Sequence, residues 1–136
     1  MIKILVADDS LSWCNFHKIN LEELFIELDI NDYKTDIVMS GEAGYNKAVE
    51  NSDTPYDLII SDLQMEENYS PKYAGEWFIE QVKTLKNYYN TKYIICSGCG
   101  NIKQIAENLN TDYIPKYLAI TNVEDYKNLV KENLGV

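Results

Sequence analysis

The sequence predicts a doubly wound α/β fold, in which a five-stranded parallel sheet carries helices on both faces. Two observations support this prediction. Short apolar runs alternate along the chain with longer segments whose apolar residues recur at helical spacing. The run Leu58-Ile59-Ile60 is also unbroken by polar residues, which is typical of a strand buried on both faces.

Length and composition limit the possible functions. The chain has 136 residues, and we expect a single domain over residues 1–136. Its net charge is −10 and all 12 basic residues are lysines, so nucleic acid and anionic membranes are unfavourable partners. No segment has the length of a membrane-spanning helix or the pattern of a signal peptide, and the expected compartment is the cytoplasm.

The elements are expected in alternating order. Strands are expected at residues 2–7, 35–39, 58–60, 93–96 and 113–114. The first helix should follow Ser10, which is a good N-cap residue. Further helices are expected at residues 41–50, along the face that carries Phe78, Val82 and Leu85, at residues 102–109, and from residue 122 or 123 to 134.

Polar side chains follow the strand ends at Asp8, Asp9, Asp62, Ser97 and Lys116. The carboxyl ends of parallel strands meet at one edge of a sheet, so these side chains can converge there. Three carboxylates brought together repel one another unless a cation offsets them, and oxygen ligands at an open edge suit Mg²⁺. A lysine and a hydroxyl supply the counter-charge and the donor that a phosphoryl group needs. The pattern therefore points to phosphoryl transfer.

With these residues in this order, the whole chain resembles the receiver domain of a two-component response regulator, similar to the chemotaxis regulator with the flavodoxin-like strand order 2-1-3-4-5. The resemblance implies that Asp62 is the phosphoryl acceptor. It implies that Asp9 binds Mg²⁺ directly and Asp8 through water, together with Asp62 and the backbone carbonyl of Gln64.

The resemblance also implies a switch. Ser97 matches the switch hydroxyl, Lys116 the lysine that contacts the phosphoryl group, and Tyr113 the aromatic switch position. The donor would be a phosphohistidine on a sensor histidine kinase or a histidine phosphotransfer protein. Tyr113 would swing inward behind Ser97 and alter the face formed by the fourth helix, the fifth strand and the fifth helix, where a downstream protein would bind. We expect a stand-alone signalling domain, not an enzyme beyond self-phosphotransfer and autodephosphorylation.

Several positions depart from the family pattern. Tyr117 follows Lys116 where the family usually has proline, and Pro115 precedes the lysine instead. Glu66 replaces the proline that is common after the methionine of the acceptor loop, and with Glu67 it adds negative charge that could assist or hinder metal binding. The loop over residues 66–74 is several residues longer than is usual in the family.

Three alternatives remain. A pseudo-receiver would keep the fold and the partner face but take no phosphoryl group. A Mg²⁺-dependent phosphohydrolase using Asp62 as nucleophile would need a second general acid and a substrate pocket, and neither is visible in the sequence. Flavin binding on the same sheet order would need a phosphate loop rich in Ser, Thr and Gly after the first strand, and none is present.

The sequence Cys96-Ser-Gly-Cys99 needs a separate interpretation. A CxxC pair can be redox-active, or it could join Cys14 and His17 in a zinc site. However, this pair straddles a strand end, and the central strand should separate the first and fourth βα units. We therefore expect Cys96 to be a small buried hydrophobic residue and Cys99 a loop residue.

Overall fold

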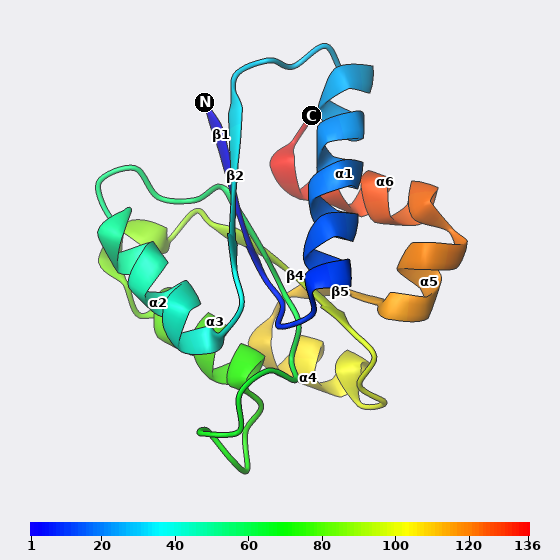
Figure 1. Cartoon of the computed structure of the whole chain (residues 1–136). Helices are drawn as coiled ribbons and strands as arrows, with labels where there is room; N and C mark the ends of the chain where they lie inside the picture. The colour runs from blue at the N-terminus through cyan, green and yellow to red at the C-terminus, as the bar shows by residue number, and fades with distance from the viewer.

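The computed structural model describes residues 1–136 and contains one parallel sheet. Its strand order is β2-β1-β3-β4-β5, which confirms the predicted fold class and strand order (Figure 1). The strands are β1 (Ile2–Ala7), β2 (Tyr33–Val38), β3 (Leu58–Ser61), β4 (Lys92–Ser97) and β5 (Asp112–Pro115).

Helices cover both faces of the sheet, as predicted (Figure 1). On one face lie α1 (Leu11–Glu27), α5 (Lys116–Thr121) and α6 (Val123–Leu134). On the other lie α2 (Gly41–Glu50), α3 (Ala74–Lys83), the 3₁₀ turn η1 (Lys86–Tyr88) and α4 (Ile102–Leu109). None of these helices is both long enough and apolar enough to cross a membrane.

The central strands are buried on both faces because their successive side chains enter different cores. In β1, Ile4 and Val6 pack beneath α1 and α6, whereas Leu5 and Ala7 pack beneath α2 and α3. Neighbouring β3 follows the same alternation, with all four residues buried. A strand enclosed in this way has no solvated side, which explains why its sequence is an unbroken apolar run.

The structure corrects the bounds of the second strand and adds one helix that was not predicted. The second strand runs from Tyr33 to Val38 instead of 35–39, because the ladder with β1 already begins at the pair Ile2 and Tyr33. Residues 116–121, for which no helix was predicted, form the short helix α5, which begins directly after Pro115. The predicted final helix does begin at Val123, and it is therefore α6.

Candidate functional site

The acidic residues of the site are brought together by the register of β1 and β3. Ala7 pairs with Ser61, so the next residue of each strand, Asp8 and Asp62, lies at the same edge. The Asp62 amide extends this ladder by donating to the Ala7 carbonyl at 2.9 Å. Asp8, Asp9 and Asp62 each offer one oxygen, and these oxygens lie within 4.8 Å of one another. Asp8 and Asp62 are buried and Asp9 is exposed.

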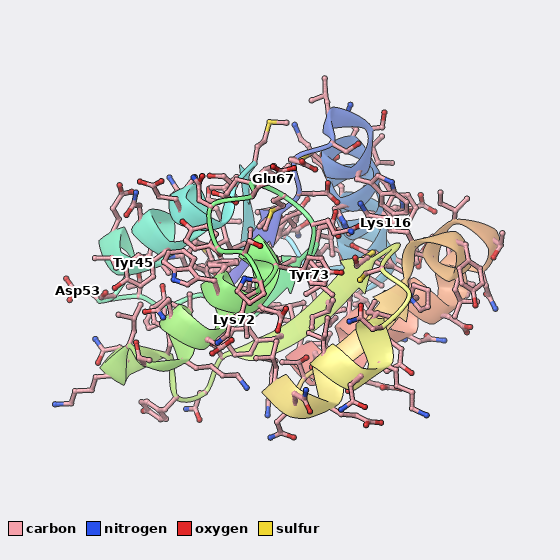
Figure 2. All side chains as sticks on the ribbon, turned by 90° about the horizontal axis from the view of Figure 1, so that it is seen from below. Tyr45, Asp53, Glu67, Lys72, Tyr73 and Lys116 are labelled. Atoms are coloured by element: carbon pink, nitrogen blue, oxygen red, sulfur yellow. The ribbon has the colours of Figure 1, made fainter.

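Lys116 reaches the same edge from β5, whose last residue, Pro115, pairs with Ser97. Its ammonium donates a hydrogen bond to Asp62 Oδ2 at 2.8 Å and lies 3.0 Å from Asp8 Oδ2. Figure 2 looks onto this edge and labels Lys116. The lysine is thus placed between the two buried carboxylates, although Tyr117 follows it and Pro115 precedes it.

The electrostatics of the site reflect burial and pairing acting in opposite directions. Burial raises the pKa of Asp8 above its usual value, and the charge of Asp62 adds to this, while Lys116 opposes it. Burial alone would lower the pKa of Lys116, but its contacts with Asp62 and Asp8 outweigh burial and raise that pKa. The ammonium therefore stays charged beside the two buried carboxylates.

The oxygen atoms present suit a hard divalent cation. Asp8 Oδ1 accepts the Ser10 N–H at 2.9 Å, whereas the buried Oδ2 of Asp8 has no hydrogen-bond partner and lies 3.0 Å from the Lys116 ammonium. Asp62 Oδ1 accepts the Leu63 N–H at 2.7 Å. An unbonded buried carboxylate oxygen beside the exposed Asp9 is the type of ligand set that Mg²⁺ or Mn²⁺ uses.

The other predicted residues lie around this cluster. Ser97 ends β4 and is fully buried, and its Oγ accepts the Cys99 N–H at 3.2 Å. No hydrogen bond joins Ser97 to Asp62 or Lys116 in this structure. Tyr113 pairs with Ile95 across β4 and β5 and packs, half-buried, against the core beneath α2, α3 and α4. Gln64 follows Asp62 by two residues, and its side chain is exposed.

The long loop over residues 66–73 projects beyond the strand ends and contacts both neighbouring helices (Figure 1). Glu66 binds the start of α2, where Oε1 accepts the Gly41 N–H at 2.6 Å and Oε2 accepts the Glu42 N–H at 3.2 Å. Tyr69 stacks on Trp77 of α3, with ring centroids 4.2 Å apart. The carboxylate at position 66 therefore caps a helix.

Two residues of the site were missed by sequence reasoning. Gly75 packs against the backbone that carries Asp62, and a Cβ built on Gly75 would lie 2.0 Å from the Asp62 carbonyl oxygen. A glycine early in a helical pattern is a signal of such a close approach. Trp13 covers Lys116, with the ammonium 4.9 Å from a ring centroid. Nothing in the residue pattern indicates that contact.

The cysteines of the CxxC sequence enter opposite cores. Cys96 is buried beneath α1 and α6, as expected, whereas Cys99 follows the strand end and packs against the core beneath α2, α3 and α4. Cys14 Sγ contacts the Asp8 carbonyl at 3.2 Å, and His17 Nδ1 lies 2.7 Å from the Tyr126 hydroxyl. The thiols and the imidazole are therefore dispersed among separate partners.

No family model and no curated protein matches the sequence. The similarity to known proteins therefore comes from comparison of structures. A signal receiver domain of a histidine kinase system from Clostridium thermocellum is similar over 98% of each chain, with TM-score 0.71 and 18% identity. The Mn²⁺-bound response regulator Rcp1 is similar over 99% of this chain and 91% of its own, with TM-score 0.55 and 16% identity.

A longer response regulator, RcsB from Salmonella typhimurium, is similar with TM-score 0.63 and 14% identity. The match covers 99% of this chain but only 65% of RcsB, which is described as interacting with DNA. The chain therefore has the fold of response regulator receiver domains, the class of two-component signalling proteins to which these structures belong.

Proposed function

We propose that the protein is a single receiver-type signalling domain that accepts a phosphoryl group on Asp62. The observation that carries this proposal is the placement of Lys116 2.8 Å from Asp62, with Asp8 and Asp9 beside them at the carboxyl edge of the sheet. The fold shared with receiver domains supports it. The donor is a phosphohistidine on a sensor histidine kinase or a histidine phosphotransfer protein.

In the transfer, a carboxylate oxygen of Asp62 forms a bond to phosphorus while the bond between phosphorus and the donor imidazole breaks. The imidazole nitrogen retains the bonding electron pair. Asp8, Asp9, Asp62 and the backbone carbonyl of Gln64 are the residues that would hold Mg²⁺. When bound, the ion neutralises charge on the phosphoryl oxygens. The unbonded Oδ2 of Asp8 and the Mn²⁺ bound by Rcp1 support a divalent ion here.

Lys116 and Ser97 then stabilise the product. Lys116 exchanges its hydrogen bond with Asp62 for one with a phosphoryl oxygen, so that its charge remains paired. The Ser97 hydroxyl already accepts the Cys99 N–H, which leaves its own proton available to donate. Tyr113 lies on the strand next to Ser97 and would move inward when Ser97 changes partner. These differential contacts favour one of two conformations.

The output is a changed protein-binding face formed by α4, β5 and α6. A downstream protein is the partner on this face, since a net charge of −10 disfavours both nucleic acid and membrane surfaces. On this proposal the protein works in the cytoplasm and is not an enzyme acting on a separate substrate.

The test is incubation with acetyl phosphate and Mg²⁺, followed by intact-protein mass measurement. We expect one phosphoryl adduct on the natural protein, and none on Asp62→Asn or when EDTA replaces Mg²⁺. If neither protein takes an adduct, the chain is a binding module with a receiver fold. Steady hydrolysis of a phosphate ester that depends on Asp62 would instead favour a phosphohydrolase. Either result would overturn the proposal.

A further inference from the structure

A closed series of contacts joins Asp8 to Lys116 through the start of α1. Asp8 Oδ1 accepts the Ser10 N–H at 2.9 Å, and Ser10 Oγ accepts the Trp13 N–H at 3.4 Å. The Trp13 ring then lies 4.9 Å from the Lys116 ammonium, which itself lies 3.0 Å from Asp8 Oδ2. The same carboxylate therefore fixes the helix that carries the tryptophan and pairs with the lysine that the tryptophan covers.

The Trp13 ring is held from behind by other aromatic side chains. Its ring centroid lies 4.9 Å from that of Phe16 and 6.0 Å from that of His17. Phe16 and His17 both pack on Tyr126 of α6, at 5.2 and 5.5 Å. The His17–Tyr126 pair is nearly completely buried. This support fixes the orientation of the indole face toward Lys116.

A fixed Trp13 ring beside Lys116 matters because lysine has a flexible side chain. Its ammonium sits on four methylene groups with much rotamer freedom and is strongly attracted to bulk water. An indole face attracts a cation electrostatically and excludes water from one side of it. The Trp13 ring at 4.9 Å and the carboxylates of Asp62 and Asp8 at 2.8 and 3.0 Å together restrict where the ammonium can lie.

We propose that Trp13 is a positioning residue that holds the Lys116 ammonium over Asp62, ready to contact an incoming phosphoryl group. Its role in transfer rests on the proposed function of Asp62, whereas the placement of Lys116 does not. Trp13 does not touch the transferred group. It acts by limiting where Lys116 can lie when the lysine exchanges carboxylate for phosphoryl oxygen.

Placement is tested by NMR of the unphosphorylated protein. Protons above an indole face are shifted upfield by its ring current, so the ε-methylene protons of Lys116, assigned by their loss in Lys116→Met, should resonate upfield of ordinary lysines. Trp13→Leu should return them to the ordinary position, and Trp13→Phe, which keeps an aromatic face, should retain part of the shift. Trp77→Leu, which removes the other tryptophan of the chain, should leave them unchanged.

Transfer is tested by the rate of adduct formation from acetyl phosphate. We expect Trp13→Leu to slow it about fivefold, the effect of one cation–π contact, and Trp13→Phe to recover part of the rate. Unshifted Lys116 protons in the natural protein, or an unchanged rate in Trp13→Leu, would overturn the proposal. If no variant or natural protein forms an adduct, the proposed function fails, and the NMR result still decides whether Trp13 positions Lys116.

Discussion

At each of the two edges of the sheet a lysine ammonium lies against an aromatic ring, but its hydrogen-bond partners differ between the edges. At the carboxyl edge, Lys116 bonds to the carboxylate of Asp62 at 2.8 Å. At the amino edge, the Lys3 ammonium bonds to Asn51 Oδ1 at 2.7 Å and to the Thr54 carbonyl at 2.5 Å, which are neutral oxygens. In both cases the ammonium lies 4.9 Å from a ring centroid.

The partners decide what each lysine can do. Burial lowers the pKa of Lys3, and its neutral partners do not compensate for this. The pKa of Lys116 is raised in spite of burial, because two carboxylates face it. Neutral oxygens complete a fixed structural link, whereas a carboxylate can be replaced by an anionic phosphoryl oxygen of similar charge. The comparison therefore supports the proposal that phosphoryl transfer takes place at the carboxyl edge, and it gives the Lys3 contacts at the amino edge a structural role.

The largest expected effect is at Gly75, which allows α3 to approach the backbone of Asp62 and Leu63. A Cβ there would lie 2.0 Å from the Asp62 carbonyl oxygen and 2.8 Å from Leu63 Cα, both backbone atoms. We expect Gly75→Ala to lower the free energy of unfolding by about 3 kcal/mol or more, measured by urea denaturation. Gly98→Ala is the matched control, since nothing lies within 4 Å of the added atom, and an equal loss in both variants would contradict this explanation.

His17, behind the carboxyl edge, shows how burial changes the pKa of a basic side chain that has no carboxylate partner. Burial, with a contribution from the charge of Lys116, lowers the pKa of His17 from 6.5 to about 3. Between these values the unfolded chain binds a proton that the folded protein does not, so stability falls as pH decreases, by about 1.4 kcal/mol per pH unit. The loss begins as the pH drops through 6.5.

The variant His17→Gln cannot be protonated and should lack this pH dependence. Urea denaturation at pH 7 and pH 5 should show the stability advantage of the natural protein shrinking by about 2 kcal/mol at the lower pH. An advantage that is the same at both pH values would mean that the His17 pKa is equal in the folded and unfolded states, so that burial does not lower it.

Replacing the two lysines separates the two edges directly. We expect Lys3→Met to lower the free energy of unfolding by about 1–2 kcal/mol, because the oxygens of Asn51 and Thr54 lose their donor. Its thermal stabilisation by added Mg²⁺ should equal that of the natural protein. Lys116→Met should be stabilised by Mg²⁺ at least as strongly as the natural protein, since the ion then faces the carboxylates without a competing cation. Loss of the stabilisation by Mg²⁺ in Lys3→Met would contradict the conclusion that the two edges have different roles.

The smallest expected effect is at Glu66, whose carboxylate caps α2. Glu66→Gln removes the negative charge from the helix start while keeping one oxygen acceptor, and we expect a loss of about 0.5–1 kcal/mol in urea denaturation. Glu67→Gln is the control, because Glu67 is exposed and its side chain makes no hydrogen bond or ion pair. A larger loss of stability in Glu67→Gln would show that the effect at position 66 comes from the change in net charge and not from the contact with the start of α2.

Much of the fold and the location of the site could be predicted because parallel topology determines both. Two largely apolar runs, Ile2–Ala7 and the one that ends before Asp62, clearly indicate buried strands. Once their order is known, the residues that follow them must meet at one edge. The approach of Asp8, Asp62 and Lys116 follows from that order without knowledge of any loop.

What could not be predicted depends on local packing rather than on order. The contact of Trp13 with Lys116 requires both the rotation of α1 about its axis and the path of a flexible lysine. Helix α5 has only six residues, too few to show a helical period. The role of Glu66 depends on how a long loop folds back onto α2, which no spacing rule describes.

The most direct test of the central claim is to locate the phosphoryl group. After incubation with acetyl phosphate and Mg²⁺, borohydride reduction converts an aspartyl phosphate into homoserine, and peptide mass analysis identifies the modified position. We expect homoserine at position 62 alone. A modification at any other residue, or none at position 62, would contradict the assignment of this edge as a phosphoryl-accepting site.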